Sequence, residues 1–305
     1  MNKKYLGLTL GIYGDIIGRP YESAIFHVLK RKKELGDAFV PMIQALRKTF
    51  IFEDIEKEWR AISGNNQIWD EVHKKVNSKA WKFSDDTVLT MATLAAIKEN
   101  PKDPSFAKHY HSFGQKYQGL GFGPGFRKWV LEENPGPAYG ATTNGSAMRV
   151  GPIGYMDLNL NEMVRLAELS ASVTHNSEEA VWGAVQVVKA IYKTRVEGWS
   201  PGSIANNILI NEFKINDRSC LIETPHDTFD YQCRETIKSV ANVLHCSDNA
   251  IDLIHNCIRI GGDVDTIAMI AGTIFGAYDL GLIPDIVTKK VEQELSEEML
   301  LLLEN

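Results

Sequence analysis

The sequence predicts an all-α fold, and two observations support that class. Apolar residues recur three and four positions apart through most of the chain, and no train of alternating apolar and polar residues indicates strands. With 305 residues, of which 44% are hydrophobic, the chain can bury a large core. Because no Ser/Pro-rich linker or internal repeat divides it, we predict a single multi-helix domain over residues 1–305.

Apolar periodicity places the helices, and capping side chains mark where several of them begin. A Ser, Asn or Asp just before an apolar run can accept hydrogen bonds from the free N–H groups of the first turn. The capping candidates are Ser84, Asn176 or Ser177, and Ser247 or Asp248. Gly281 and Pro284 separate the last two helices. In chain order, the predicted helices are Asp86–Glu99, Leu160–Val173, Ser177–Val196, Tyr231–Leu244, Asn249–Ile258, Val264–Leu280 and Asp285–Leu303.

The apolar run from Ile267 to Ile283 is the one candidate in the sequence for a membrane span, and it is too short. Its roughly 17 residues fall below the ~20 that a helix needs to cross a bilayer, and it contains Asp279. We interpret it as a buried helix. Ala268, Gly272 and Gly276 recur at every fourth position and share one face, so another helix can approach closely there.

Composition and charge exclude several classes of protein. The net charge of −6 argues against a protein that binds the phosphate backbone of nucleic acids, which is normally basic. Cys220, Cys233, Cys246 and Cys257 lack both the paired spacing of a metal site and the density of a disulfide scaffold, so we expect reduced thiols. The first residues resemble a secretory signal, but Asp15 follows soon and no cleavage site is obvious. We therefore predict a cytoplasmic protein.

Two adjacent carboxylates stand where one of the predicted helices begins. In Ser84-Asp85-Asp86-Thr87, the serine suits a helix cap and an acid suits the positive end of the helix dipole. That structural interpretation accounts for one aspartate, but a second carboxylate before so apolar a helix strains it. This segment alone leaves a structural and a functional interpretation open.

A second segment repeats the arrangement and favours a metal site. Asp263, Asp265 and Thr266 lie at the start of the small-residue helix, after Gly261 and Gly262, which let backbone approach a ligand closely. Two clusters of acids and hydroxyls at the N-terminal ends of buried helices cost folding free energy unless a cation neutralises them. Oxygen ligands of this kind favour Mg²⁺, Mn²⁺ or Ca²⁺ over zinc. A dinuclear site is the simplest arrangement.

Three further segments carry polar residues that the helical pattern leaves unexplained. Residues 11–22 end in Glu22, residues 142–154 form another glycine-punctuated helix entrance, and His175 precedes a long helix. A lone histidine beside a helix cap is usually structural, but alongside the acidic segments we expect a functional one. Glycines and aromatics crowd residues 113–154, which we predict to be substrate-binding loops.

The ordered set of motifs resembles the ADP-ribosylglycohydrolase family, which includes hydrolases of ADP-ribosyl-arginine and ADP-ribosyl-serine. The resemblance runs from about Leu6 to Pro284 through G-D-x-x-G-x-x-x-E, S-D-D-T, N-G-S-A-M-R, T-H and G-G-D-x-D-T. No single motif is sufficient, whereas their order is specific. The resemblance implies a compact, all-helical domain with a dinuclear metal cleft that holds two Mg²⁺ or Mn²⁺ ions.

The resemblance also implies roles for individual residues. The metal ligands it implies are Ser84, Asp85, Asp86, Asp263, Asp265 and Thr266. The substrate-binding residues it implies are Gly123, Gly125, Gly140, Asn144, Gly145, Ser146 and His175. Glu22 matches the acid beside the metals, and Glu22 and Asp86 are the catalytic candidates for proton transfer. Phe122 or Phe126 is suited to stacking on adenine.

Two parts of the chain depart from the family pattern. Thr143 stands where many relatives have glycine, which leaves the course of that ligand loop open. Residues 23–82 match no family element, and we interpret them as a variable helical insert that shapes the substrate entrance. The basic run of residues 30–33 within this insert is expected to be a solvated helix face.

Together, the residues and the resemblance predict a metal-dependent hydrolase that removes ADP-ribose from a modified acceptor, with arginine-linked ADP-ribose on protein preferred. We expect an ADP-ribosylated protein or another ADP-ribose conjugate as partner, ADP-ribose as product, and a monomer. Serine-linked, nucleic-acid-linked and small-molecule conjugates stay open, as does a catalytically silent ADP-ribose-binding protein. An isoprenoid synthase is a distant alternative, because that class needs D-D-x-x-D and here Leu89 takes the last position.

Overall fold

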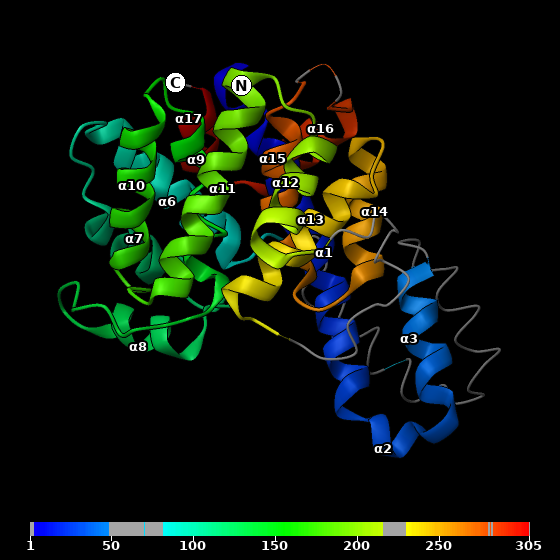
Figure 1. Ribbon diagram of the computed structural model, residues 1–305. Helices are drawn as coiled ribbons and strands as arrows, with labels where there is room; N and C mark the ends of the chain where they lie inside the picture. Colours follow the sequence, from blue (N-terminus) through cyan, green and yellow to red (C-terminus); the bar gives the residue numbers. More distant parts are fainter. Residues whose placement is uncertain are drawn as a thin grey trace.

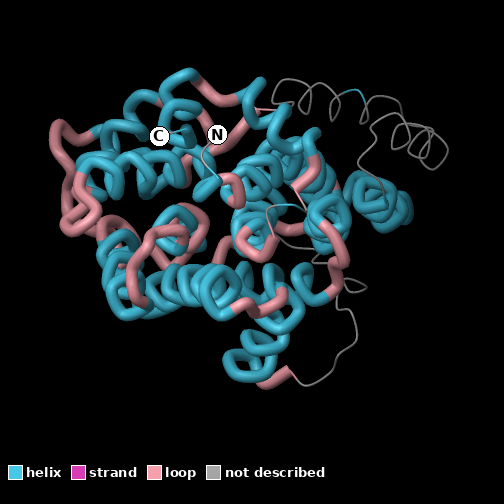
Figure 2. Tube along the Cα trace, turned by 90° about the horizontal axis from the view of Figure 1, so that it is seen from above, coloured by secondary structure: helices cyan, strands magenta, loops and turns pink. Residues whose placement is uncertain are grey.

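The described part of the chain consists of helices and their connecting loops. The structure, a computed structural model, describes residues 3–48, 70, 82–215, 230–279, 281 and 283–304. Within these ranges no strand occurs (Figure 2). One isolated antiparallel bridge joins Thr143 to Gln232. The predicted all-α fold is confirmed. The assignment of the whole chain to one domain stays a prediction.

The helices fall into three stretches of sequence. The first contains η1 (Lys3–Tyr5), α1 (Leu8–Lys30), α2 (Lys32–Leu35), η2 (Gly36–Ala38) and α3 (Phe39–Lys48). The second contains α6 (Asp85–Glu99), α7 (Phe106–Lys116), α8 (Pro124–Leu131), η3 (Asn144–Ser146), α9 (Gly151–Gly154), α10 (Leu160–Ser172), α11 (Glu178–Glu197) and α12 (Pro201–Phe213). The third contains α13 (Cys233–His245), α14 (Ala250–Ile260), α15 (Val264–Gly276), α16 (Asp285–Glu294) and α17 (Glu297–Glu304).

The helix α15 lies at the centre of the fold, and α1 packs against it (Figure 1). Every residue of α15 is buried. A Cβ atom on Gly272 would lie 2.7 Å from the carbonyl oxygen of Leu10, and one on Gly14 would lie 2.8 Å from the backbone of Ala268. Because these distances leave no room for a side chain, the glycines permit the two helices to meet backbone to backbone. The close approach predicted for the small-residue face is confirmed.

The sequence pattern failed to predict α1. Its glycines and the internal Pro20 weaken a helix on intrinsic propensity, and Pro20 also removes a backbone donor. Burial against α15 outweighs these costs, since most helical stability comes from tertiary packing. The shorter helices α7, α8 and α12 were also not predicted, and α8 and α9 occupy part of the 113–154 interval that we expected to be loops.

The predicted helix ends agree with the structure at two caps and disagree at others. Ser84 accepts from the N–H of Asp86, and Ser177 accepts from that of Ala180, as predicted. The cap of α14 is Asn249, so the expectation of Ser247 or Asp248 is wrong. The helix predicted over residues 285–303 is two helices, because Leu295 has extended backbone.

The cysteine prediction is wrong in part. Cys233 and Cys257 are free and buried, whereas Cys246 is disulfide-bonded. Spacing along the sequence does not show which thiols meet in space, so this bond could not be predicted.

No helix within the described ranges combines the length and apolar character that a membrane span requires. The run predicted to be a buried helix lies largely in α15, all of which is buried.

The predicted insert, residues 23–82, begins inside a helix of the core. Its first eight residues complete α1, and α2 and α3 follow on one side of the molecule (Figure 1). The basic run is at the surface, where the Lys30 ammonium lies 4.1 Å from the ring centroid of Phe26. Residues 49–69 and 71–81 of the insert lie outside the described residues.

Candidate functional site

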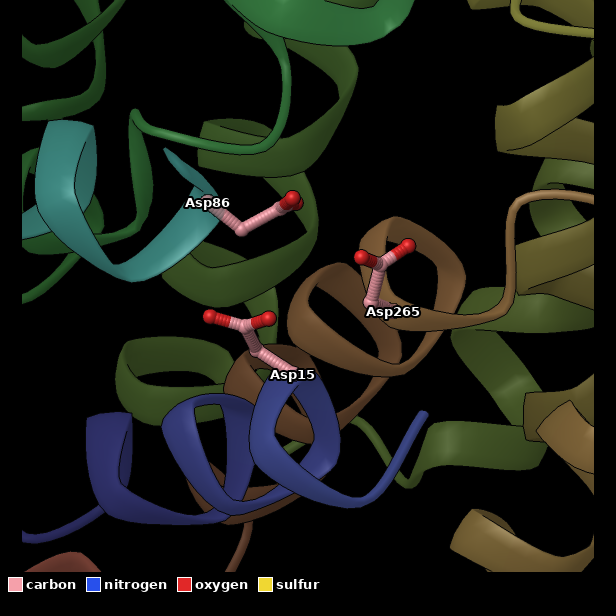
Figure 3. A group of neighbouring side chains, drawn as sticks. All are labelled: Asp15, Asp86 and Asp265. Carbon is pink, nitrogen blue, oxygen red and sulfur yellow. The ribbon is translucent and has the colours of Figure 1, made fainter. Parts of the chain in front are cut away.

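Three helices bring three buried carboxylates to one point. Asp15 comes from α1, Asp86 from α6 and Asp265 from α15, and each offers an oxygen within 4.8 Å of the other two. Figure 3 shows the three side chains pointing toward a common space. They are 0%, 3% and 5% exposed, respectively. Residues 250 positions apart in sequence therefore form one cluster, which we call the first carboxylate group.

A second carboxylate group shares one residue with the first. Glu22, Asp263 and Asp265 also offer oxygens that lie within 4.8 Å of one another. Glu22 lies seven residues after Asp15 on α1, two helical turns along the same face. Asp265 thus belongs to both groups, an arrangement that suits two cations sharing one carboxylate.

Burial raises the pKa of the four aspartates of the two carboxylate groups. The pKa values of Asp86 and Asp265 lie well above the usual value, first because of burial and then because of neighbouring carboxylates. Burial also raises the pKa of Asp15 and of Asp263, although hydrogen bonds oppose the shift at both. Without a cation, the folded state therefore disfavours the ionised form of these groups.

The donor set fits a hard divalent cation. Asp86 Oδ2 accepts from the Ser84 hydroxyl at 2.9 Å, whereas its buried Oδ1 has no hydrogen-bond partner among the described residues. A buried carboxylate oxygen without a donor is costly, and a metal ion supplies the missing interaction. Carboxylate and hydroxyl oxygens are the ligands that Mg²⁺ and Mn²⁺ prefer.

Asp15 is a candidate site residue that the motifs in the sequence did not single out. Its Oδ2 accepts three hydrogen bonds, from the Ser84 N–H at 2.9 Å, from the Thr87 N–H at 3.2 Å and from the Thr87 hydroxyl at 2.5 Å. These bonds attach the first turn of α6 to α1 and fix the position of Asp86. The available signal was its place in the same G-D-x-x-G-x-x-x-E motif as Glu22, on one face of a helix.

The second acidic segment is held by hydrogen bonds from its surroundings. The amide of Asn144 donates to Asp263 Oδ2 at 2.5 Å and to the Thr236 hydroxyl at 3.0 Å. The Thr266 side chain hydrogen-bonds Asp263, and its N–H donates to Asp265 Oδ1 at 3.0 Å. Asn144, predicted to bind substrate, is therefore placed against a carboxylate of the second group.

Asp85 lies outside both carboxylate groups. A Cβ on Gly121, whose φ is +113°, would lie 2.7 Å from Asp85 Oδ1, so this carboxylate faces the loop before α8. Burial, followed by the charges of Asp15 and Asp263, raises its pKa to about 7. The role of Asp85 as a metal ligand stays a prediction.

The glycines predicted to bind substrate have differing local surroundings. Gly140 has φ +70°, a left-handed conformation that favours glycine, and Gly123 precedes α8 with open space at its Cβ position. A Cβ on Gly125 would lie 2.7 Å from the Tyr139 ring. The Ser146 hydroxyl is buried and donates to the carbonyl of Ala180 at 2.8 Å. The sequence-predicted roles of these residues in binding stay predictions.

The aromatic pair suggested for adenine is part of the core. Phe122 and Phe126 are buried and stack on each other, with ring centroids 4.8 Å apart. Phe126 also contacts Trp129 at 5.5 Å. Each ring covers one face of the other, and both side chains are buried at 2% and 5% exposure, so neither offers a free face to a ligand in this structure.

His175 lies next to the loop that reaches the carboxylates. Its Nε2 is 3.2 Å from the Thr143 hydroxyl, and Thr143 precedes Asn144, which holds Asp263. A Cβ on Gly145 would lie 2.9 Å from Nε2, which explains glycine at that position. Burial, and then the charge of Arg149, lowers the pKa of His175 to about 3, so the imidazole is neutral at physiological pH.

A pocket opens beside the second carboxylate group. It is lined by Asp230, Glu235, Thr236, Ser239, Gly262, Asp263 and Ile267. Two carboxylates that belong to neither group, Asp230 and Glu235, thus face a space that ends at Asp263. This pocket suits a cationic or hydrogen-bond-donating group of a ligand.

Mg²⁺ should stabilise the protein more as the pH rises from 5 to 8. The pKa of Asp85 is raised from 3.8 to about 7. The stability that its protonated form contributes is therefore complete below about pH 4 and is lost as the pH rises through 7. The charges of Asp15 and Asp263 contribute to this raised pKa, and a cation bound by the two carboxylate groups would offset those charges, so the difference in Tm between Mg²⁺ and EDTA should widen with pH.

Differential scanning calorimetry at several pH values measures that difference. The lowered pKa of His175 acts in the opposite sense, since its contribution is lost as the pH falls below 6.5 toward 3. This contribution is present in both the Mg²⁺ and the EDTA curves and cancels in their difference. A difference in Tm that stays flat between pH 5 and 8 would argue against a cation among these carboxylates.

Comparisons with known proteins agree with the geometry. A family model described as ADP-ribosylglycohydrolase matches residues 2–304. An uncharacterized protein of Archaeoglobus fulgidus is 26% identical over 271 residues, which cover 79% of this chain and 88% of that protein. A solved structure titled ADP-ribosylglycohydrolase-related protein complex is similar with a TM-score of 0.56 and 18% identity, over 72% of this chain and 80% of that chain, which supports the fold. Since the family model spans nearly the whole chain, the protein belongs to the ADP-ribosylglycohydrolase family.

Proposed function

We propose that the protein is a metal-dependent hydrolase that releases ADP-ribose from arginine-linked ADP-ribosyl protein. The observation that carries this proposal is the pair of carboxylate groups joined at Asp265, within a chain of the ADP-ribosylglycohydrolase family. Two Mg²⁺ or Mn²⁺ ions bound there would orient the ribose hydroxyls and the attacking water. Family membership also removes the isoprenoid-synthase alternative.

In this proposal, the two catalytic candidates have different roles. Asp86 has a buried oxygen without a donor among the described residues and is suited to holding a cation. Glu22 is less buried and belongs to the second carboxylate group, beside the pocket. Glu22 accepts a proton from the water whose oxygen bonds to C1″, and returns it to the nitrogen as the C1″–N bond breaks.

The acidic pocket favours an arginine acceptor. A guanidinium carries five donors in a planar fork, which pairs well with carboxylates and hydroxyls. Asp230 and Glu235 supply two carboxylates next to Asp263, and Thr236 and Ser239 supply hydroxyls. Lys238 lies 3.5 Å from Glu235, but this ion pair is partly exposed and contributes little. Serine-linked and nucleic-acid-linked acceptors would present no cation to this pocket.

A panel of conjugates tests the preference. ADP-ribosyl-arginine protein, ADP-ribosyl-serine peptide, poly(ADP-ribose), O-acetyl-ADP-ribose and ADP-ribosylated DNA would each be assayed with Mg²⁺, Mn²⁺ or EDTA. We expect the highest kcat/KM for the arginine conjugate and no turnover in EDTA. A preference for another conjugate would reject the arginine assignment. Binding of ADP-ribose in calorimetry without turnover of any conjugate would instead support a silent binding protein.

Neutralising the pocket should raise KM for the arginine conjugate. The double variant Asp230→Asn, Glu235→Gln removes both charges, and we expect a rise of about tenfold or more in KM with kcat little changed. Glu298→Gln is the matched control, since Glu298 pairs with Lys116 in an exposed ion pair. An unchanged KM would show that the pocket does not bind the acceptor.

The monomeric state and the cytoplasmic location stay predictions.

A further inference from the structure

Arg149 is a buried cation whose position the carboxylate groups do not explain. Its side chain is 0% exposed, and its Nε and Nη1 have no hydrogen-bond partner among the described residues. Its guanidinium carbon lies 4.1 Å from the ring centroid of Tyr110. Burial lowers the pKa of Arg149, but a guanidinium keeps its proton at neutral pH. Burying this charge is costly, so its remaining contacts are informative.

Those contacts form a chain that ends at the loop beside the carboxylates. Arg149 Nη2 donates to the Ser170 carbonyl at 2.6 Å and to the Thr174 hydroxyl at 3.0 Å. The Thr174 hydroxyl lies 2.7 Å from His175 Nδ1. On the other side of the imidazole, His175 Nε2 lies 3.2 Å from the Thr143 hydroxyl.

We propose that Arg149 is a positioning residue that, through Thr174, holds His175 in the neutral form with its proton on Nε2. The imidazole then presents an N–H donor to the loop from Thr143 to Ser146 and to an oxygen of ADP-ribose bound beside it. The part that concerns ADP-ribose rests on the proposed function, whereas the protonation state does not.

The direction of each hydrogen bond follows from what each group can donate. Arginine has no acceptor, so Thr174 Oγ1 accepts from it. The Tyr139 phenol also hydrogen-bonds the Thr174 side chain, and burial raises the pKa of Tyr139, which keeps its proton. The Thr174 hydroxyl has a single proton, and the imidazole nitrogen 2.7 Å away is a stronger acceptor than a phenol oxygen, so this proton goes to His175 Nδ1. Nδ1 is then an acceptor, and the neutral imidazole carries its proton on Nε2.

The charge of Arg149 favours the same arrangement. Arg149 reaches the imidazole from the Nδ1 side, through Thr174, so a proton on Nδ1 would be repelled more strongly than one on Nε2. A second proton on the His175 imidazole would place a buried imidazolium beside the buried guanidinium of Arg149. Tyr139, whose ring centroid lies 5.8 Å from that of His175, is neutral and does not offset the repulsion.

Nitrogen NMR of the imidazoles tests the protonation state in the metal-free protein. With ¹⁵N-labelled histidine at pH 7, we expect His175 to show an unprotonated Nδ1 and a protonated Nε2, the signals being assigned from His175→Gln. Thr174→Val removes the hydroxyl and should populate the other tautomer, whereas Thr174→Ser should restore the wild-type pattern. Arg149→Met should act like Thr174→Val where that variant folds.

Calorimetric titration with ADP-ribose in Mg²⁺ tests the consequence for binding. We expect Thr174→Val to weaken binding by about tenfold and Thr174→Ser to restore it. Thr194→Val is the matched control, because Thr194 is a buried threonine whose hydroxyl donates to the Ala190 carbonyl within α11. It should leave the His175 signals unchanged.

Distinct results overturn the distinct parts of this inference. A proton on Nδ1, or a cationic His175 at pH 7, would reject the proposed protonation state. An unchanged spectrum in Thr174→Val would reject the positioning role of Arg149. A changed spectrum with unchanged ADP-ribose affinity would reject the donor role toward the ligand. Failure of the wild-type protein to bind ADP-ribose would reject the proposed function, while the spectra would still decide the role of Arg149.

Discussion

Replacing Asp265 by asparagine is expected to lower kcat by about a thousandfold or more at saturating Mg²⁺. Asp265 is the residue that the two carboxylate groups share, so the change weakens both candidate cation positions. Losing metal stabilisation of the transition state costs several kcal/mol, and about 4 kcal/mol corresponds to ~10³ in rate. Steady-state hydrolysis of an ADP-ribosyl-arginine protein across a Mg²⁺ titration measures this effect.

The Asp265→Asn experiment needs a control that removes a carboxylate elsewhere. Asp157→Asn is suitable, because Asp157 is exposed and pairs with Lys4 at 2.7 Å, away from the carboxylate groups. We expect wild-type kcat for Asp157→Asn. Circular dichroism would show that Asp265→Asn keeps its helices. Wild-type turnover by a folded Asp265→Asn variant would make the metal-centred mechanism wrong.

Replacing Asp15 by alanine is expected to destabilise the fold by roughly 3 kcal/mol or more. The change leaves the N–H groups of Ser84 and Thr87 and the Thr87 hydroxyl without their acceptor in a buried place. Each unsatisfied buried group costs about 1–3 kcal/mol. Removing one carboxylate also relieves repulsion within the first carboxylate group, but near pH 6 the raised pKa values of its members make that gain smaller.

Urea unfolding at pH 6 in EDTA measures the effect of Asp15→Ala without a contribution from metal binding. A loss of this size corresponds to a fall in Tm on the order of 5–10 °C. Asp15→Asn is the conservative partner, because it keeps one carbonyl oxygen for the Thr87 donors and should lose less. A midpoint equal to that of the wild type would show that the hydrogen bonds from α6 to Asp15 do not hold the first turn of that helix.

The N-terminal residues of α6 and α15 could be predicted because helix-capping signals and candidate metal ligands occur there together. Ser84 is a recognisable helix cap, and the acids after it are recognisable ligands, so one short segment carries both pieces of information. The same holds for Asp263 and Asp265 after two glycines. The close contact of α15 with a partner helix could be predicted because small residues recur at helical spacing.

Asp15 and α1 could not be predicted from local signals. The glycines of α1 and Pro20 oppose a helix on intrinsic propensity. The reason for the glycines is their close contact with α15, which only the folded structure shows. Once that helix is missed, helical spacing no longer shows that Asp15 and Glu22 lie two turns apart on one face, and their shared G-D-x-x-G-x-x-x-E motif is the remaining signal. The error in the helix and the omission of Asp15 therefore have one cause.

Long-range contacts determine which partners the candidate site residues meet. The amide of Asn144 donates to Asp263, 119 positions away, and its role in binding substrate stays a prediction. Phe122 and Phe126 are suited to stacking by residue type, yet they stack on each other. The residue type determines what a side chain is able to bind, whereas tertiary packing determines which partner the side chain contacts.

Calorimetric titration of the metal-free protein with Mn²⁺ decides whether two cation sites share Asp265. The wild type should bind two ions. Glu22→Gln should weaken one of the two binding steps, Asp86→Asn should weaken the other, and Asp265→Asn should weaken both. An Asp265→Asn variant that keeps one step at wild-type affinity, or a wild-type protein that binds no Mn²⁺, would contradict a dinuclear site joined at Asp265.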